Sequence, residues 1–124
     1  MVLPRRRSLI EIKADCFTDR IVLMYKYLVN GNIETIMAKQ VYRSGTSIGA
    51  NITESQNAQS DADFVSKLSI ALKEADETLY WLKKLYTGGY LTNKQFNSME
   101  ADNIEIIKIL TSIIKTKKKN MGII

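Results

Sequence analysis

The sequence predicts an all-α protein, folded as an antiparallel up-down-up-down four-helix bundle in one domain that spans residues 1–124. Apolar residues recur at helical spacing in four segments, and short polar or glycine-containing stretches separate these segments. Pro4 is the only proline, so the rest of the chain is free to be helical almost throughout. A chain of 124 residues with 45% hydrophobic content is large enough to bury most of its apolar surface.

The first helix is expected over about residues 8–28, because Ser8 and Glu11 have the spacing of a capping box. Its main apolar stripe would face the core. A second, narrower stripe lies nearly opposite and consists of Ile12, Cys16 and Leu23. A helix in a monomeric bundle has no reason to carry apolar residues there, so this stripe indicates a subunit interface. The alternative is a set of scattered surface hydrophobic residues.

The second helix is expected over about residues 33–56, with Asn32 as its N-cap and Glu34 in the first turn. Polar residues line one flank of its apolar arc, and we interpret them, with one glutamate of the third helix, as a structural polar core. The members of this set are Gln40, Arg43, Ser47, Asn51, Glu54 and Glu74.

The third helix is expected over about residues 61–86, between a cap at Ser60 or Asp61 and the glycines at 88–89. If it pairs antiparallel with the second helix about residues 58–59, Arg43 comes level with Glu74. A planar guanidinium and a carboxylate match well, so the sequence predicts an ion pair between these two residues. We interpret this pair as fixing the helix register, without a chemical role.

Ile70 and Trp81 lie toward the side of the third helix that faces away from its main apolar stripe, with Glu77 beside them. A partly exposed tryptophan is a frequent anchor of protein contacts. Ile70 and Trp81 are therefore a second candidate for an oligomer interface.

The fourth helix is expected over about residues 93–116 and has the clearest start signal of the chain. Thr92 and Gln95 have capping-box spacing, and Leu91 and Phe96 have the spacing of a hydrophobic staple. Its apolar arc is wide, which indicates contact with more than one neighbouring helix or with another subunit.

The residue types present exclude several kinds of site. The chain has no histidine and a single cysteine, Cys16, so Cys/His zinc sites, Cys/His or Ser/His/Asp nucleophiles and an internal disulfide are excluded. No apolar run is long enough to cross a membrane, and no secretory signal is visible. We expect a cytoplasmic protein with no enzymatic activity, no metal and no cofactor. A carboxylate-based Mg²⁺ or acid/base site at Arg43, Glu54, Glu74 and Glu77 is a third, weaker alternative.

The positive charge is concentrated near the chain termini, at 1–7 and 115–124. The net charge is +5, and seven of the 18 basic residues are Arg5, Arg6, Arg7, Lys115, Lys117, Lys118 and Lys119. In an up-down-up-down bundle both termini lie at the same end, which predicts a basic end that attracts phosphate backbones. The alternative is that these residues are ordinary solubilising tails.

Part of the chain resembles a known family over about residues 12–115. The matching residues are Gln40, Arg43, Ser47, Ile48, Asn51, Ile52, Glu54, Phe64, Leu68, Ile70, Ala71, Leu72 and Glu77. They resemble the pattern of bacterial four-helix bundle proteins related to those encoded in intervening sequences of large-subunit ribosomal RNA genes. The chain departs from that pattern at Gly49, Ser55 and Lys73-Glu74, which indicates a subgroup.

The resemblance implies a homo-oligomer, in particular a pentameric ring, and no known enzymatic activity. More distantly, the family is similar to accessory proteins of diversity-generating retroelements, which are basic pentamers that associate with nucleic acid and a reverse transcriptase. We therefore expect a non-catalytic oligomer that binds RNA or DNA through its basic end, as an accessory to a nucleic-acid enzyme. The alternative is a protein-interaction or assembly module with no nucleic-acid role.

Overall fold

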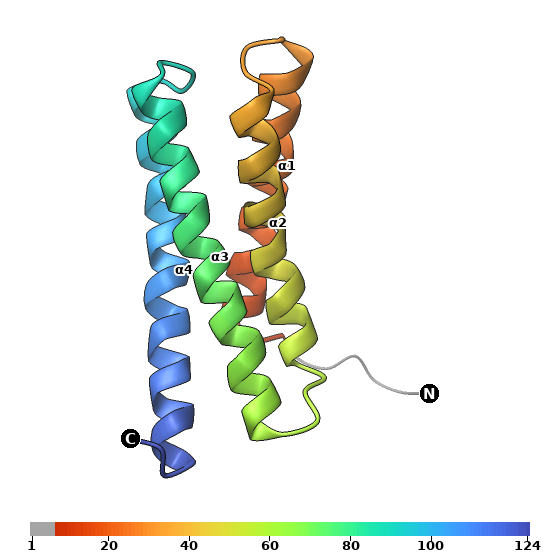
Figure 1. Ribbon diagram of the computed structural model, residues 1–124, viewed down its shortest axis with the longest axis vertical. Coiled ribbons are helices and arrows are strands. Elements are labelled where there is room, and N and C mark those ends of the chain that lie inside the picture. Colours follow the sequence, from red (N-terminus) through yellow and green to blue (C-terminus); the bar gives the residue numbers. More distant parts are fainter. Residues whose placement is uncertain (1–6) are drawn as a thin grey trace.

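The computed structural model describes residues 7–124, which form four helices and contain no strand (Figure 1). The helices are α1 (Leu9–Asn30), α2 (Ile36–Ser55), α3 (Asp61–Thr87) and α4 (Asn93–Asn120). The all-α class predicted from the sequence is confirmed. None of these helices is long and apolar enough to span a lipid bilayer. Arg5 and Arg6 lie outside the described residues.

The helices pack in a ring, so that each contacts two others. α1 packs on α2, α2 on α3, α3 on α4, and α4 on α1, and among the described helices no Cα atoms of a diagonal pair lie within 8 Å of each other. Contact is most extensive between α2 and α3 and least extensive between α1 and α4. The surfaces along which these two pairs meet therefore lie on opposite sides of the bundle, and we name them the α2/α3 face and the α1/α4 face.

The direction of the chain reverses from each helix to the next. Lys67 near the start of α3 contacts Glu54 near the end of α2, and farther along α3 Thr78 contacts Ser44. Figure 1 shows the same reversal at each loop, with α2 and α3 in front of α1 and α4. The start of α1, the α2–α3 loop and the end of α4 lie toward one end of the bundle.

The core is built from the apolar stripes of all four helices. Phe17, Ile21, Ile48, Leu82 and Leu110 are at most 1% exposed. Burying a side chain of this size contributes about 1.5–3 kcal/mol to the hydrophobic term. Close helix approach also depends on small residues: a Cβ added at Gly45 would lie 2.8 Å from side-chain atoms of Ile21.

Buried polar side chains interrupt this core, among them Ser44, Thr78 and Asn103. Thr78 lies 2.9 Å from the hydroxyl of Ser44 and donates to the carbonyl oxygen of Glu74 at 2.8 Å. Asn103 Nδ2 donates to the carbonyl oxygen of Ala75 at 3.0 Å, and no described group pairs with its Oδ1. Since an unpaired buried polar atom is costly, each of these bonds constrains how the helices fit together.

The starts of α1, α3 and α4 follow the capping residues that the sequence predicts. Ser8 and Glu11 form a capping box at α1, and Thr92 and Gln95 form one at α4. Ser60 caps α3, where its hydroxyl accepts from the backbone N–H of Asp63 at 3.0 Å. These side chains satisfy backbone N–H groups that have no partner within the helix.

The predicted start of α2 was wrong. Asn32 has φ 50° and terminates α1 in the left-handed conformation, where the N–H of Ile33 donates to the carbonyl of Leu28 at 2.9 Å. The N-cap position of α2 is Thr35, and a Glu34 side-chain oxygen accepts from the N–H of Met37 at 2.6 Å. Asparagine suits either role because it tolerates positive φ as well as capping helices.

The predicted end of α4 was also wrong, because the helix continues to Asn120 and does not stop near residue 116. Gly122 then takes φ 77°, and the N–H of Ile123 donates to the carbonyl of Lys118 at 3.0 Å. Lysine is a good helix former, and its charge is favourable at a helix C-terminus. The C-terminal lysines are therefore part of a regular helix.

Candidate nucleic-acid interface

The described basic residues near the termini differ in how freely their charge is exposed. Lys115 and Lys119 are exposed, whereas Lys117 and Lys118 are half-buried. Lys117 Nζ binds Asp61 at 2.8 Å and lies 5.3 Å from the centre of the Phe64 ring. These contacts tie α4 to the start of α3, so Lys117 has a structural role that the sequence did not indicate.

Arg7 is not in contact with the lysines of α4. Its guanidinium binds Asp15 at 3.2 Å and donates to the carbonyl oxygen of Glu11 at 3.2 Å, so it lies along its own helix. In Figure 1 the last turns of α4 project beyond the first turn of α1. The described cationic residues at this end therefore lie in two separate places. Arg7 is paired on α1, whereas α4 carries the exposed Lys115 and Lys119.

The α2/α3 face carries the predicted structural polar residues, which lie at the surface and not in the core. Arg43 donates to Glu74 at 3.3 Å, as expected, and also binds Glu77, which accepts from Trp81 Nε1 at 3.2 Å. Side-chain exposure is 51% for Arg43 and 17% for Glu74. The network therefore joins the predicted polar set to the predicted interface residue Trp81.

The other members of the polar set line the same face. Ser47 donates to the carbonyl of Arg43 at 2.7 Å, Asn51 donates to the carbonyl of Ser47 at 2.8 Å, and Glu54 binds Lys67 at 3.1 Å. Gln40 and Glu54 are exposed, and Ser47 and Asn51 are half-buried. These residues flank the apolar arc of α2 at the point where it meets solvent.

Electrostatic partners raise the pKa of three cationic groups on the two faces. The hydrogen bond to Glu77 and the charge of Glu74 raise the pKa of Arg43 above its ordinary value. Hydrogen bonds to Glu105 and Glu54 raise the pKa values of Lys13 and Lys67, respectively, above 10.5. All three groups therefore remain charged at neutral pH.

The α1/α4 face contains the apolar stripe predicted on the first helix. Ile12 is 45% exposed, Leu23 is 64% exposed, and Cys16 is exposed. Lys13 binds Glu105 across this face, and Arg20 binds Asp102. On the opposite face Ile70 is 41% exposed and Trp81 is half-buried, so both predicted interface sets reach the surface.

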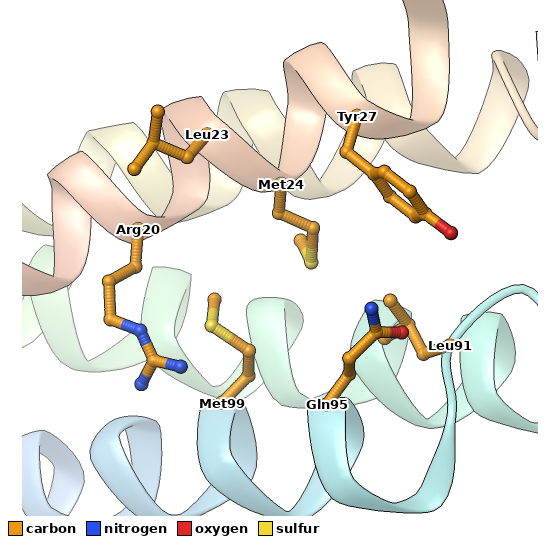
Figure 2. A pocket seen from close by; sticks show the side chains of 7 residues that line it. All are labelled: Arg20, Leu23, Met24, Tyr27, Leu91, Gln95 and Met99. Atoms are coloured by element: carbon orange, nitrogen blue, oxygen red, sulfur yellow. The ribbon is translucent and has the colours of Figure 1, made fainter. Parts of the chain in front are cut away.

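Two hollows open between α1 and α4. One has a volume of about 270 Å³, and Figure 2 shows how the side chains of α1 and α4 line it from opposite sides. Its lining residues are Arg20, Leu23, Met24, Tyr27, Leu91, Gln95 and Met99. The other, of about 260 Å³, lies beside Ile12 and Cys16. The side chains of this face are thus less completely packed than those on the α2/α3 face.

The carboxylates considered as a metal or acid/base site are engaged by cations. Glu74 and Glu77 bind Arg43, and Glu54 binds Lys67. In the described part of the chain, no group of three or more His, Cys, Asp or Glu side chains could hold a metal ion. The arrangement provides cation–carboxylate pairs that hold helices together.

The fold and these surfaces define an all-α four-helix bundle protein. The family model described as "23S rRNA-intervening sequence protein" matches residues 8–112. The chain belongs to this family, as its sequence pattern indicated. No protein with a curated description matches it.

A solved structure supports the same assignment. It is the 1.70 Å crystal structure of a protein with unknown function from the S23 ribosomal protein family of Bacteroides thetaiotaomicron VPI-5482. The two chains are 54% identical, with a TM-score of 0.85, and the match covers 86% of this chain and 99% of that chain.

Proposed function

We propose that this protein is a non-catalytic, oligomeric bundle that binds RNA or DNA in the cytoplasm through cationic residues near the end of α4. The observation that carries the proposal is the exposure of Lys115 and Lys119 on a regular helix, while Lys117 is held by Asp61. Lysines fixed on a helix can contact phosphates without the cost of ordering a tail. The family description names intervening sequences in 23S rRNA, so RNA of that kind is the first target to test.

Binding of a fluorescent RNA and the equivalent DNA, measured by polarisation at about 50 and 200 mM salt, tests this function. Affinity should fall steeply with salt, because each neutralised phosphate contributes about 0.9 to the logarithmic slope. Lys115→Gln with Lys119→Gln should weaken binding and flatten the slope. Lys73→Gln with Lys83→Gln removes the same charge from exposed positions of α3 and is the matched control. Absence of binding at the lower salt would refute the proposal.

The oligomer that we propose is a head-to-tail ring, with five subunits as the expected number. The α1/α4 face and the α2/α3 face lie on opposite sides and carry different side chains, so contact between them would be heterologous and could close into a ring. In a five-membered ring, the seven basic residues near the termini would supply about 35 positive charges, although Arg7 and Lys117 of each chain are paired with aspartates. As an accessory protein, such a ring could deliver nucleic acid to an enzyme.

The competing proposal is an assembly module that binds another protein through the exposed apolar residues. It is favoured by Leu23, which is 64% exposed beside a hollow. Leu23→Asp distinguishes the two functions when native mass and RNA affinity are both measured. A lower mass with a parallel decrease in affinity supports the oligomeric RNA-binding protein. If the wild type binds no RNA but forms a stable complex with another protein, and Leu23→Asp abolishes that complex, the assembly module is supported.

A further inference from the structure

Three exposed lysines lie in a line on the outer side of α4. Lys108, Lys115 and Lys119 are seven and four residues apart, so their side chains leave the helix in nearly the same direction. They belong to one continuous helix and span about 16 Å along its axis. We name these three residues the α4 lysine row.

No ion pair of the described residues neutralises a lysine of the row, although Glu100 and Glu105 line one hollow with Lys108. Of the acidic residues of α4, Glu105 binds Lys13, and Asp102 binds Arg20. The remaining one, Glu100, is half-buried and lies two turns before the row. No hydrogen bond or ion pair engages a lysine of the row in the described part of the molecule. The pairing of α4 acids with α1 thus leaves one side of α4 cationic.

Aromatic side chains that could stack on bases lie elsewhere. The exposed tyrosines, Tyr27, Tyr42, Tyr80 and Tyr86, occupy the parts of their helices nearest the α1–α2 and α3–α4 loops. Phe64 lies beside the end of α4, but Lys117 covers its ring. Proteins that bind single strands combine cationic grooves with exposed aromatic rings. The row supplies the charges without such rings, which favours a duplex whose bases are already stacked.

We propose that the α4 lysine row binds the sugar-phosphate backbone of a nucleic-acid duplex, with Lys108 as a direct phosphate contact beside Lys115 and Lys119. This rests on the proposed nucleic-acid function and specifies both its surface and its target. In this proposal the phosphate contacts lie along the side of α4, whereas the distribution of charge in the sequence predicted contacts at the end of the bundle. Lysine acts as a point charge, so the row contacts phosphates regardless of base sequence.

Lys108 gives the sharpest test, because it lies outside the basic terminus. The probe is a fluorescein-labelled RNA duplex of about 20 base pairs, compared with an unstructured single strand of the same length. Lys108→Gln should weaken duplex binding several-fold and lower the logarithmic salt slope by about 0.9 for each phosphate that is no longer neutralised. Lys73→Gln, at an exposed lysine of α3, should leave both quantities unchanged. Circular dichroism and native mass verify that both variants keep the fold and assembly.

The outcomes separate this inference from the function on which it rests. Salt-dependent duplex binding that Lys108→Gln reduces and Lys73→Gln does not would support the row. Equal effects of the two variants would overturn the row and leave the general nucleic-acid function standing. Tighter binding of the single strand would overturn the duplex as the target. No RNA or DNA binding by the wild type, or binding to anionic phospholipid vesicles in its place, would overturn both.

Discussion

The α2/α3 face is closed by polar bonds, whereas the α1/α4 face is bridged by two ion pairs beside open apolar hollows. On the first, Ser44 and Thr78 meet in the buried layer, and Arg43 joins two carboxylates at the surface. On the second, Leu23 and Ile12 remain exposed. Both faces expose apolar side chains, but those of the α1/α4 face lie beside open hollows, so this face is the less completely packed of the two.

The largest decrease in stability is expected from a substitution at a fully buried position of the α2/α3 face, which we also call the closed face; the α1/α4 face is the open face. Ser44→Leu adds bulk to a fully buried position between α2 and α3, so it should reduce the free energy of unfolding by about 1–3 kcal/mol. Urea denaturation measures this change. Cys16→Leu is the control on the open face and should change stability by less than about 0.5 kcal/mol. Equal decreases would show that the two faces are packed alike.

A smaller decrease is expected from the surface network of the closed face. Arg43→Met removes both ion pairs of that arginine and should cost about 1 kcal/mol, because Arg43 is half-exposed and solvent screens its charge. Had Glu74 been fully buried, the cost would have been roughly 3–5 kcal/mol. Thermal and urea unfolding provide the measurement, with Lys67→Met as a control that removes one exposed pair. A decrease above about 3 kcal/mol would contradict the observed exposure.

On the open face, truncation should affect assembly more than folding. Leu23→Ala should change the free energy of unfolding of the dissociated subunit by no more than about 0.5 kcal/mol, because the side chain is mostly exposed there. The same variant should lower the native mass at a fixed protein concentration. Analytical ultracentrifugation and urea denaturation of one sample separate the two effects. An unchanged mass would argue against the α1/α4 face as a subunit interface.

The smallest effect concerns alkaline pH. The folded-state pKa of Lys13 is raised by Glu105, so the stability that this pair contributes is fully present below pH 10.5 and disappears as pH rises through the folded pKa. Arg43 keeps its charge over this range, so its pairs with Glu74 and Glu77 should persist at pH values where the Lys13 pair is lost. The difference in melting temperature between wild type and Lys13→Met should shrink from about pH 9 to about pH 11.5. A constant difference would show that charge pairing is not its cause.

Local signals predicted the helices well, because capping and periodicity depend on residues close in sequence. The boxes at Ser8 and Thr92 began helices where expected, and antiparallel pairing correctly brought Arg43 to Glu74. Asn32 was misassigned because asparagine favours both a helix start and a left-handed turn. Which of two compatible local structures forms is decided by packing that the sequence pattern does not display.

The candidate interface was harder to predict, because the state of each charge depends on residues distant in sequence. The sequence alone does not distinguish the lysines near the C-terminus from one another. In the fold, however, Lys117 binds Asp61, whereas Lys119 is exposed. The sequence did not indicate Lys108 as a basic contact, because it lies within an apolar-rich segment and outside the basic terminus. Its prominence comes from the pairing of Glu105 with Lys13, which only the fold establishes.

The buried amide of Asn103 makes one alignment of α4 on α3 different from all others. Apolar residues recur every four positions at Ile106, Leu110 and Ile114, so moving α4 by one turn would place similar side chains in similar spaces. The bond from Asn103 to the carbonyl of Ala75 would not survive that shift, and a whole amide would then be buried without a partner, at a cost of about 1–3 kcal/mol. Together with the Lys117–Asp61 pair, the Asn103 side chain thus distinguishes the native alignment of α4 on α3 from one displaced by a turn.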